Sequence, residues 1–340
     1  MAGQTTSDPA AGREAEVSVE LFGTQVRLLA AGPPEGTPSA EVGLAQVEAL
    51  LREMHDRLTR FEPDSELCAL NSSPDEDFSG SIFLTSGVDA ALQAARDSDG
   101  LIDPVMIENL AEIGYSESKA GMQPAPLEEA LSSAPDRKPA TPRDDSPWRR
   151  IEVDDDQGVV SRPVGVRIDL GGIGKGLAAD LAASRLDGFA SWCADIGGDL
   201  RLGGTAGVDR EIGVTHPLSG EVEIRFDLSQ GAVATSGISR RVWSSPGGDS
   251  YSHHLLDPST GLPAWTGVIQ ATAVAGSARE AETLSKMALL SGPDKGAEIL
   301  SAGAGGVIVL DSGEIVAVGP LAGRIGGGSA DPTAKLEGNA

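Results

Sequence analysis

The chain has 340 residues, and its 51 acidic side chains outnumber its 26 lysines and arginines, which gives a formal charge of −25. Binding to a nucleic-acid backbone or to an anionic membrane surface needs clustered positive charge, so this balance argues against both. Hydrophobic residues make up 40% of the chain, an ordinary globular fraction, but aromatic residues make up only 4%. We therefore expect a folded protein with an aliphatic core and no nucleic-acid partner.

The N-terminal region lacks the basic and apolar segments of a secretory signal and has no lipid-anchor cysteine. No run of about 18 apolar residues occurs, so no membrane span is predicted and the expected location is the cytoplasm. The two cysteines, Cys68 and Cys193, are too few and too far apart for a disulfide framework or a cysteine zinc site. We interpret both as small buried apolar residues.

Composition divides the chain into a flexible tail at 1–16, one domain at 17–319 and a low-complexity tail at 320–340. Both tails are rich in small and polar residues. Within the domain, about 116–150 is rich in proline, serine, aspartate and arginine. This stretch is predicted to be a long, loop-rich connection with one short helix near 127–131.

Hydrophobic spacing predicts a strand or bent hairpin at 17–31, an amphipathic helix at 41–60 and a second helix at 86–97. The stretch between the two helices contains Pro63 and the sequence Asn-Ser-Ser-Pro at 71–74, which indicates loops. A loop and short helix are expected at 100–115.

The second half is predicted to be rich in strands. A hairpin is expected at 151–169, with an Asp/Gly turn and its second strand ending at Asp169. Further strands are predicted at 187–195, 211–214, 222–228, 232–235, 268–274 and 306–310, and helices at 176–186, 278–290 and 293–301. Because hairpins are common and strands do not alternate regularly with helices, we favour an α+β fold with mostly antiparallel sheets and flanking helices.

The segment DLGGIGKGLAADL at 169–181 runs from the expected strand through a glycine-rich turn into a helix that begins near Lys175. Glycines allow close backbone approach, and a helix N-terminus offers free N–H groups to an anion. The spacing matches neither the dinucleotide fingerprint nor the P-loop. A phosphate contact and a plain turn with a solvated lysine both remain open.

The segment HHLLDPSTGLPA at 253–264 places His254 three residues before Asp257 in a turn rich in hydroxyl groups, which is typical of a substrate-contacting loop. A zinc site lacks a third ligand at suitable spacing, and a serine nucleophile lacks its G-x-S-x-G elbow. On the helix at 278–290, Glu282 and Lys286 are four residues apart. Spacing alone predicts a surface ion pair worth about 0.3–0.5 kcal/mol.

Eight segments in chain order resemble the ApbE family of FAD:protein FMN transferases, over roughly 20–315. They are FGTQV at 22–26, FEPDSELCALN at 61–71, DGLIDP at 99–104, DLGGIGKGLAAD at 169–180, ADIGGDLRLGG at 194–204, ATSGISRR at 234–241, HHLLDPSTGLPA at 253–264 and EAETLSKMALL at 280–290. The resemblance implies an ApbE-like, T-fold-like architecture. It also implies an enzyme that cleaves FAD with Mg²⁺, joins FMN by a phosphoester to a Thr or Ser of an acceptor protein and releases AMP.

The resemblance also assigns residues. It implies that FAD contacts Phe22, Phe61, Leu101, Ile102, Asp103, Asp169, Lys175, Thr235, Ser236 and His254. His254, Lys175 and Asp257 are the catalytic candidates, with His254 as the acid or base. The backbone carbonyl of Gly172 and the positions of Glu282 and Lys286 correspond to the metal site.

At that metal site the chain departs from the family, which usually has Asp and then Thr or Asp where this sequence has Glu282 and Lys286. A protonated lysine has no lone pair for a metal ion. Three interpretations remain open: a metal site with fewer protein ligands and more water, a site in which the lysine alters the metal dependence, and an FAD-binding protein with little transferase activity. An FAD pyrophosphatase that releases FMN and AMP is a further alternative.

Overall fold

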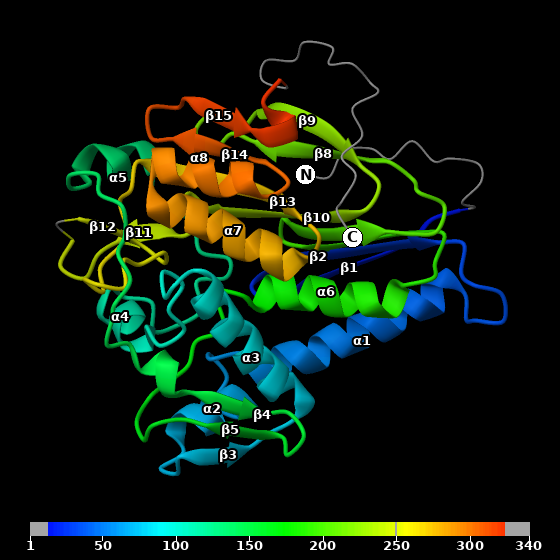
Figure 1. The fold of residues 1–340 in the computed structure, drawn as a ribbon, viewed down its shortest axis with the longest axis horizontal. Helices are drawn as coiled ribbons and strands as arrows, with labels where there is room; N and C mark the ends of the chain where they lie inside the picture. Colours follow the sequence, from blue (N-terminus) through cyan, green and yellow to red (C-terminus); the bar gives the residue numbers. More distant parts are fainter. Residues whose placement is uncertain (1–12, 249, 324–340) are drawn as a thin grey trace.

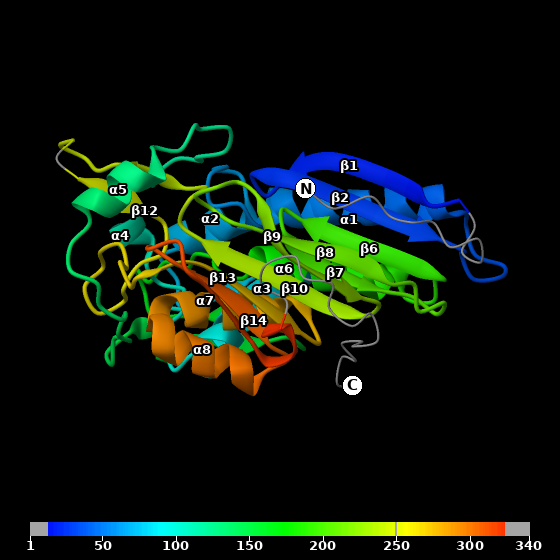
Figure 2. The ribbon, with the colours of Figure 1, turned by 90° about the horizontal axis from the view of Figure 1, so that it is seen from above.

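The structure is a computed structural model that describes residues 13–248 and 250–323. An eight-stranded sheet, in the order β1-β2-β6-β7-β10-β13-β14-β15, forms its centre, and every neighbouring pair is antiparallel (Figures 1 and 2). These strands are β1 (Ala15–Leu21), β2 (Thr24–Ala31), β6 (Ser191–Ile196), β7 (Asp199–Gly203), β10 (Gly231–Gly237), β13 (Val268–Ala275), β14 (Gly306–Leu310) and β15 (Ile315–Val318).

Eight α-helices occur in the described residues. They are α1 (Ala40–Leu58), α2 (Glu66–Ser72), α3 (Ile82–Asp97), α4 (Ile107–Glu112), α5 (Leu127–Ser133), α6 (Gly174–Leu186), α7 (Ala278–Ser291) and α8 (Pro293–Ala302). Short strands form three small antiparallel sheets, made of β3 (Asp77–Ser79), β4 (Glu152–Asp154) and β5 (Val159–Ser161), of β8 (Arg210–Thr215) and β9 (Val222–Leu228), and of β11 (Val242–Ser244) and β12 (Tyr251–His253). The predicted α+β fold with mostly antiparallel sheets and flanking helices is confirmed.

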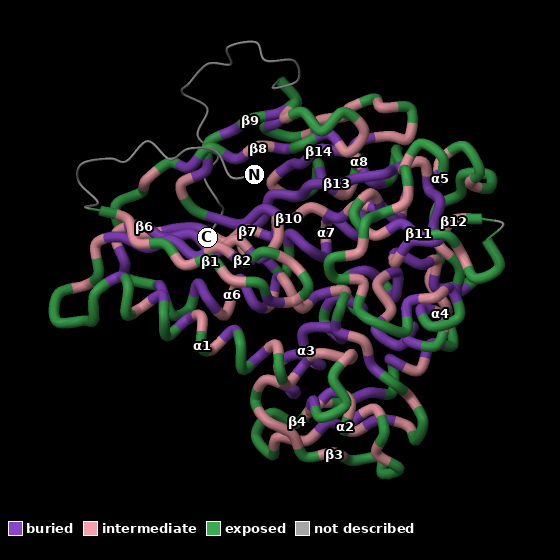
Figure 3. The backbone as a smooth tube through the Cα atoms, turned by 180° about the vertical axis from the view of Figure 1, so that it is seen from behind, coloured by how far each residue is buried: buried purple, intermediate pink, exposed green. Residues whose placement is uncertain are grey.

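The central sheet is covered on both faces. Because successive side chains of a strand point to opposite faces, Leu28 belongs to the cluster packed with α1, α3 and α6, and Leu29 belongs to the cluster packed with the β8–β9 hairpin. The central strand β13 is buried along its whole length (Figure 3). The core is aliphatic, as the low aromatic content predicts.

The predicted hairpin at 17–31 consists of β1 and β2. Phe22 and Gly23 form its two-residue turn, and both have positive φ angles, 55° and 68°. A turn of this hand suits the right-handed twist of the two strands, and it places a non-glycine residue in a rarely occupied conformation. The Phe22 ring, which lies 5.2 Å from the His55 ring, is thereby fixed at the end of the sheet beside α1.

The prediction of a strand that ends at Asp169 is wrong. The β4–β5 hairpin ends at Ser161, and the chain then continues without regular structure to α6. The Asn71 side chain makes the two backbone hydrogen bonds that a neighbouring strand would make. It donates to the Ile168 carbonyl at 2.9 Å and accepts from the Ile168 N–H at 2.7 Å. One amide side chain therefore holds this loop in place.

The loop predicted around 62–74 also contains a helix, α2. Its first turn is capped by Ser65, whose Oγ accepts from the Cys68 N–H at 3.1 Å. Seven residues are too few to show a helical period in the sequence. Strand β15 was not predicted either.

The predicted connection at 116–150 is loop-rich and contains α5 and a short 3₁₀ helix, Pro147–Arg150. Most of the two predicted tails, at 1–12 and 324–340, lies outside the described residues. No helix in the described part of the chain is long and apolar enough to cross a membrane.

Candidate functional site

Two adjoining cavities, of about 340 Å³ and 480 Å³, lie at the end of the sheet where the Phe22–Gly23 turn meets the N-terminus of α6. The first lies among α1, α3, α6 and the loops around 101–104 and 169–173. The second lies between the sheet and the β8–β9 hairpin. Four polar residues line both cavities and mark their junction: Lys175, Arg241, His254 and Lys286.

Most of the predicted site residues meet at these cavities. The first is lined by Phe22, Phe61, Leu101, Ile102, Asp103, Asp169, Gly172, Lys175, His254 and Lys286, and the second by Lys175, Thr235, Ser236, His254 and Lys286. Two predicted residues, Asp257 and Glu282, line neither cavity.

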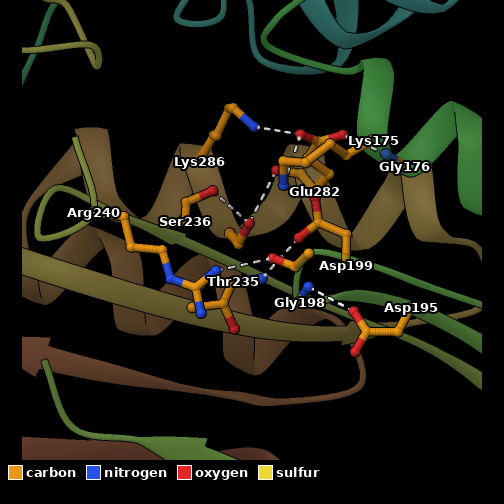
Figure 4. A network of polar contacts seen from close by, with 12 residues as sticks. Lys175, Gly176, Asp195, Gly198, Asp199, Thr235, Ser236, Arg240, Glu282 and Lys286 are labelled. Atoms are coloured by element: carbon orange, nitrogen blue, oxygen red, sulfur yellow. Dashed lines mark hydrogen bonds and ion pairs between the residues drawn. The ribbon is translucent and has the colours of Figure 1, made fainter. Parts of the chain in front are cut away.

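A network of two lysines and two carboxylates lies at the junction (Figure 4). Lys175 donates to Asp199, and its Nζ lies 3.8 Å from Oε1 of Glu282. Lys286 Nζ donates to the same Oε1 at 2.8 Å, and the Gly176 N–H donates to Oε2 at 2.8 Å. Glu282 and Lys286 are therefore a buried pair, and the surface ion pair predicted from their spacing is wrong.

The charges in this network shift one another's pKa. Burial raises the pKa of Glu282, but the ammonium groups of Lys286 and Lys175 outweigh it and hold that pKa below its ordinary value. Burial lowers the pKa of Lys175, but the carboxylates of Asp199 and Glu282 outweigh it and hold that pKa above its ordinary value. Lys175 and Glu282 are therefore charged at neutral pH.

Asp199 was not predicted as a site residue. Burial raises the pKa of its carboxyl group, which Lys175 offsets only in part. Its Oδ1 also accepts from the Thr235 N–H at 3.3 Å, so this carboxylate joins α6 to strand β10. Asp199 lies within the segment ADIGGDLRLGG at 194–204, but the sequence assigned it no role.

Hydroxyl pairs fix the strand that lines the second cavity. Thr235 Oγ1 lies 2.9 Å from Thr272 Oγ1 on β13, and Ser236 Oγ lies 2.8 Å from Ser285 Oγ on α7. Both hydroxyl groups of the predicted pair thus already have a protein partner. They hold β10 against β13 and α7.

A cluster of one arginine and two aromatic residues, Arg60, Phe61 and Tyr115, lines the first cavity. The guanidinium of Arg60 lies 4.3 Å from the centre of the Phe61 ring and 4.6 Å from that of Tyr115, close enough for cation–π attraction. Its Nε lies 3.2 Å from the Asp169 carboxylate. Sequence reasoning missed Arg60, Tyr115 and Arg241. One available signal was rarity, because the chain has only two tyrosines.

Two of the predicted aspartates hold loops together. The buried carboxylate of Asp103 accepts from the Val105 N–H at 2.9 Å and from Ser146 Oγ at 2.6 Å. Oδ1 of Asp257 accepts from the Thr141 N–H, the Ser259 N–H and the Ser259 hydroxyl. Asp257 therefore stabilises its turn and does not meet His254 at the cavities.

The adjacent residues His253 and His254 differ in their surroundings. His253 is fully buried, its ring packs edge-on against Trp265, and burial lowers its pKa to about 3. His254 lines both cavities, and no group in the described part of the chain accepts or donates at its buried Nδ1. Burial, followed by the charge of Arg241, lowers the pKa of His254 well below its ordinary value. His254 is therefore a neutral imidazole at the junction.

A model described as the ApbE family matches residues 22–310. The chain belongs to this family. Among solved structures, the ApbE protein of Thermotoga maritima is 28% identical and superposes with a TM-score of 0.72 over 90% of this chain and 97% of that one. The flavin transferase ApbE of Vibrio cholerae, at 20% identity and a TM-score of 0.69 over 92% and 99% of the two chains, shares the fold.

Curated relatives agree with this assignment. Proteins named FAD:protein FMN transferase from Vibrio cholerae and Treponema pallidum are 26% and 28% identical to this chain, over 76% and 77% of its length and 75% of theirs. The resemblance inferred from the eight segments is thus confirmed. The roles of individual residues stay predictions.

The side-chain donors of this ApbE member do not fit a divalent metal ion. Within 13–248 and 250–323, no group of three or more His, Cys, Asp or Glu side chains is placed to hold one. Of the predicted ligands, Glu282 has both oxygens engaged by Lys286 and Gly176, and an ammonium group cannot coordinate.

The crossing of α6 and α7 has no space for a side chain at Gly176. A Cβ there would lie 2.7 Å from the Ala278 carbonyl oxygen and 2.9 Å from Glu282 Oε2. We expect Gly176→Ala to lower the free energy of unfolding by about 2 kcal/mol, because backbone must move. Urea denaturation measures this. The control is Gly174→Ala on the same helix, whose Cβ would meet no described atom within 4 Å; an equal loss in both variants would contradict this explanation.

Proposed function

We propose that this ApbE family member is an FAD:protein FMN transferase. It moves FMN from FAD to a Thr or Ser hydroxyl of an acceptor protein, forms a phosphoester and releases AMP. The observation that carries the proposal is the junction, where three cationic side chains, Lys175, Lys286 and Arg241, surround one neutral imidazole, His254. The names of the curated relatives support the same activity.

The two cavities suit the two kinds of group in FAD. The first offers apolar and aromatic surface from Phe61, Leu101 and Ile102, which suits a flavin ring. The junction offers positive charge, which suits the diphosphate. The second cavity, with Thr235 and Ser236, is then left for the remaining nucleotide and for the acceptor.

The reaction follows from this placement. The acceptor hydroxyl oxygen attacks the phosphorus of the FMN half, a new P–O bond forms, and the P–O bond to the AMP half breaks. The bonding electrons leave with AMP, and the hydroxyl proton passes to His254 Nε2 or Nδ1, since a neutral imidazole has one free lone pair. Lys175, Lys286 and Arg241 stabilise the charge that develops on the phosphate oxygens and on AMP.

In the direct test, the full chain is incubated with FAD, with and without an acceptor domain that carries a threonine able to receive FMN. AMP is measured by chromatography and covalent flavin by in-gel fluorescence. The expected result is a fluorescent acceptor, with one AMP released per flavin attached. An acceptor variant with Thr→Val is the matched control and is expected to stay unlabelled.

Two outcomes would contradict the proposal. AMP and free FMN in equal amounts without acceptor would show a pyrophosphatase. Bound, intact FAD with neither AMP nor label would show a flavin-binding protein.

A further inference from the structure

The four charged groups of the network are not equally exposed to the cavities. The side chains of Lys175 and Lys286 are 25% and 10% exposed, and both line both cavities. The side chains of Asp199 and Glu282 are each 1% exposed and line neither. The cavities therefore meet two ammonium groups, with the carboxylates behind them.

Each oxygen of the two carboxylates behind the lysines already accepts a hydrogen bond. Oε1 of Glu282 faces Lys286 at 2.8 Å and Lys175 at 3.8 Å, and Oε2 accepts from the N–H of Gly176 at 2.8 Å. The oxygens of Asp199 accept from Lys175 and from Thr235. A divalent ion bound to Glu282 would lie beside the like charges of Lys286 and Lys175.

The ammonium groups keep donors for a ligand. Each has three N–H bonds, and Lys286 uses one on Glu282 while Lys175 uses one on Asp199. Arg241 lines both cavities beside them, and within the described residues its side chain makes no ion pair or hydrogen bond. The junction can therefore donate several charge-assisted hydrogen bonds to one anion with many oxygens.

We propose that Lys175 and Lys286 form a built-in dication that binds a diphosphate group directly, so that nucleotide binding and FMN transfer by this chain need no divalent metal ion. The identity of the nucleotide as FAD rests on the proposed function. The carboxylates of Glu282 and Asp199 accept hydrogen bonds from the two ammonium groups and so hold them in position. The transfer step is unchanged in its bonds, and the lysine charges act on the phosphate oxygens.

The test measures the binding of ADP and of FAD to the full chain by calorimetry, in EDTA and in excess Mg²⁺. We expect both to bind in EDTA, with dissociation constants that Mg²⁺ changes by less than about twofold. Lys286→Met is expected to weaken both by about tenfold or more under both conditions, because charge-assisted hydrogen bonds are lost. The matched control is Lys295→Met, which removes an exposed lysine on α8 and should change neither.

A second variant, Lys286→Thr, replaces the ammonium with a neutral oxygen donor. We expect its nucleotide binding to be weak in EDTA and to be restored by Mg²⁺, since Glu282 is then free of Lys286. Circular dichroism melting of each variant establishes that it is folded. The comparison of the unchanged protein in EDTA and Mg²⁺ needs no variant.

The outcomes separate this inference from the proposed function. FAD binding to the unchanged protein that requires Mg²⁺ would overturn the dication and leave the transferase intact. ADP binding in EDTA without FAD binding would support the dication and contradict the transferase. Binding of neither nucleotide in either condition would overturn both.

Discussion

Glu282→Gln is expected to lower the free energy of unfolding by about 3 kcal/mol at pH 7, because the ammonium groups of Lys286 and Lys175 lose the buried carboxylate between them. The amide keeps an oxygen for the Gly176 N–H, so the change removes charge and little volume. Glu282 joins α6 to α7 through this bond, and the loss is therefore shared by two helices. Urea denaturation of both proteins measures the difference.

The stability difference between the two proteins should depend on pH. The folded pKa of Glu282 lies below its ordinary value of 4.5, so its charge stabilises the fold fully above that value. This stabilisation is lost as pH falls through the folded pKa. The gap between the proteins should therefore be constant from pH 8 to about pH 6 and shrink below about pH 4.5.

An exposed glutamate provides the control. Glu298 pairs with Lys295 on α8 at 2.9 Å, and its side chain is 68% exposed. Glu298→Gln should change the free energy of unfolding by less than about 0.5 kcal/mol at any of these pH values. A loss at Glu282→Gln no larger than this would show that the junction is well solvated and that its charges do not stabilise the fold.

The long periodic elements could be predicted from the sequence, and the short ones could not. The apolar period of α1 and the alternation of β9 are set by burial on one face, which leaves a repeating signal in the residues. Helix α2 is too short for such a signal. The segment that ends at Asp169 has strand-like residues, but Asn71, 97 positions away from Ile168, supplies its hydrogen bonds instead.

The site residues could likewise be predicted where the signal is local in the sequence. Motifs that are contiguous in sequence pointed to Lys175 and His254, which the fold brings to one junction. Arg60 and Tyr115 are 55 positions apart and come together with Phe61 only in the tertiary structure. Asp103 and Asp257 occur in matching motifs, yet their carboxylates accept hydrogen bonds from nearby loops. A motif thus predicts where a residue lies in the fold better than it predicts which groups the side chain contacts.

The Glu282–Lys286 pair shows why burial decides a residue's meaning. At a spacing of four residues on an exposed helix face it is a minor stabilising pair. Where α7 packs against α6, the same spacing puts an ammonium group at the place where both cavities meet. The excess of acidic residues over the whole chain says nothing about this local positive charge.

His254→Gln is expected to leave the FAD dissociation constant within about threefold and to slow FMN transfer by about 100-fold or more, the usual range for losing a general base. The lysines and Arg241 that attract the diphosphate remain in the variant, so binding persists. Calorimetry with FAD and the initial rate of acceptor labelling give the two values. Equal losses in binding and rate would mean that His254 holds FAD and does not move the proton.

The pH dependence of transfer tests the same role. In the free protein, burial and the charges of Arg241, Lys286 and Lys175 hold the pKa of His254 well below its ordinary value. A bound diphosphate brings negative charge beside the same cations, so it should raise that pKa toward the ordinary value. Because kcat/KM reports the free protein and kcat the bound complex, the acid limb of kcat should lie at higher pH than that of kcat/KM for FAD. Coincident limbs, or limbs that persist in His254→Gln, would assign the titration to another group.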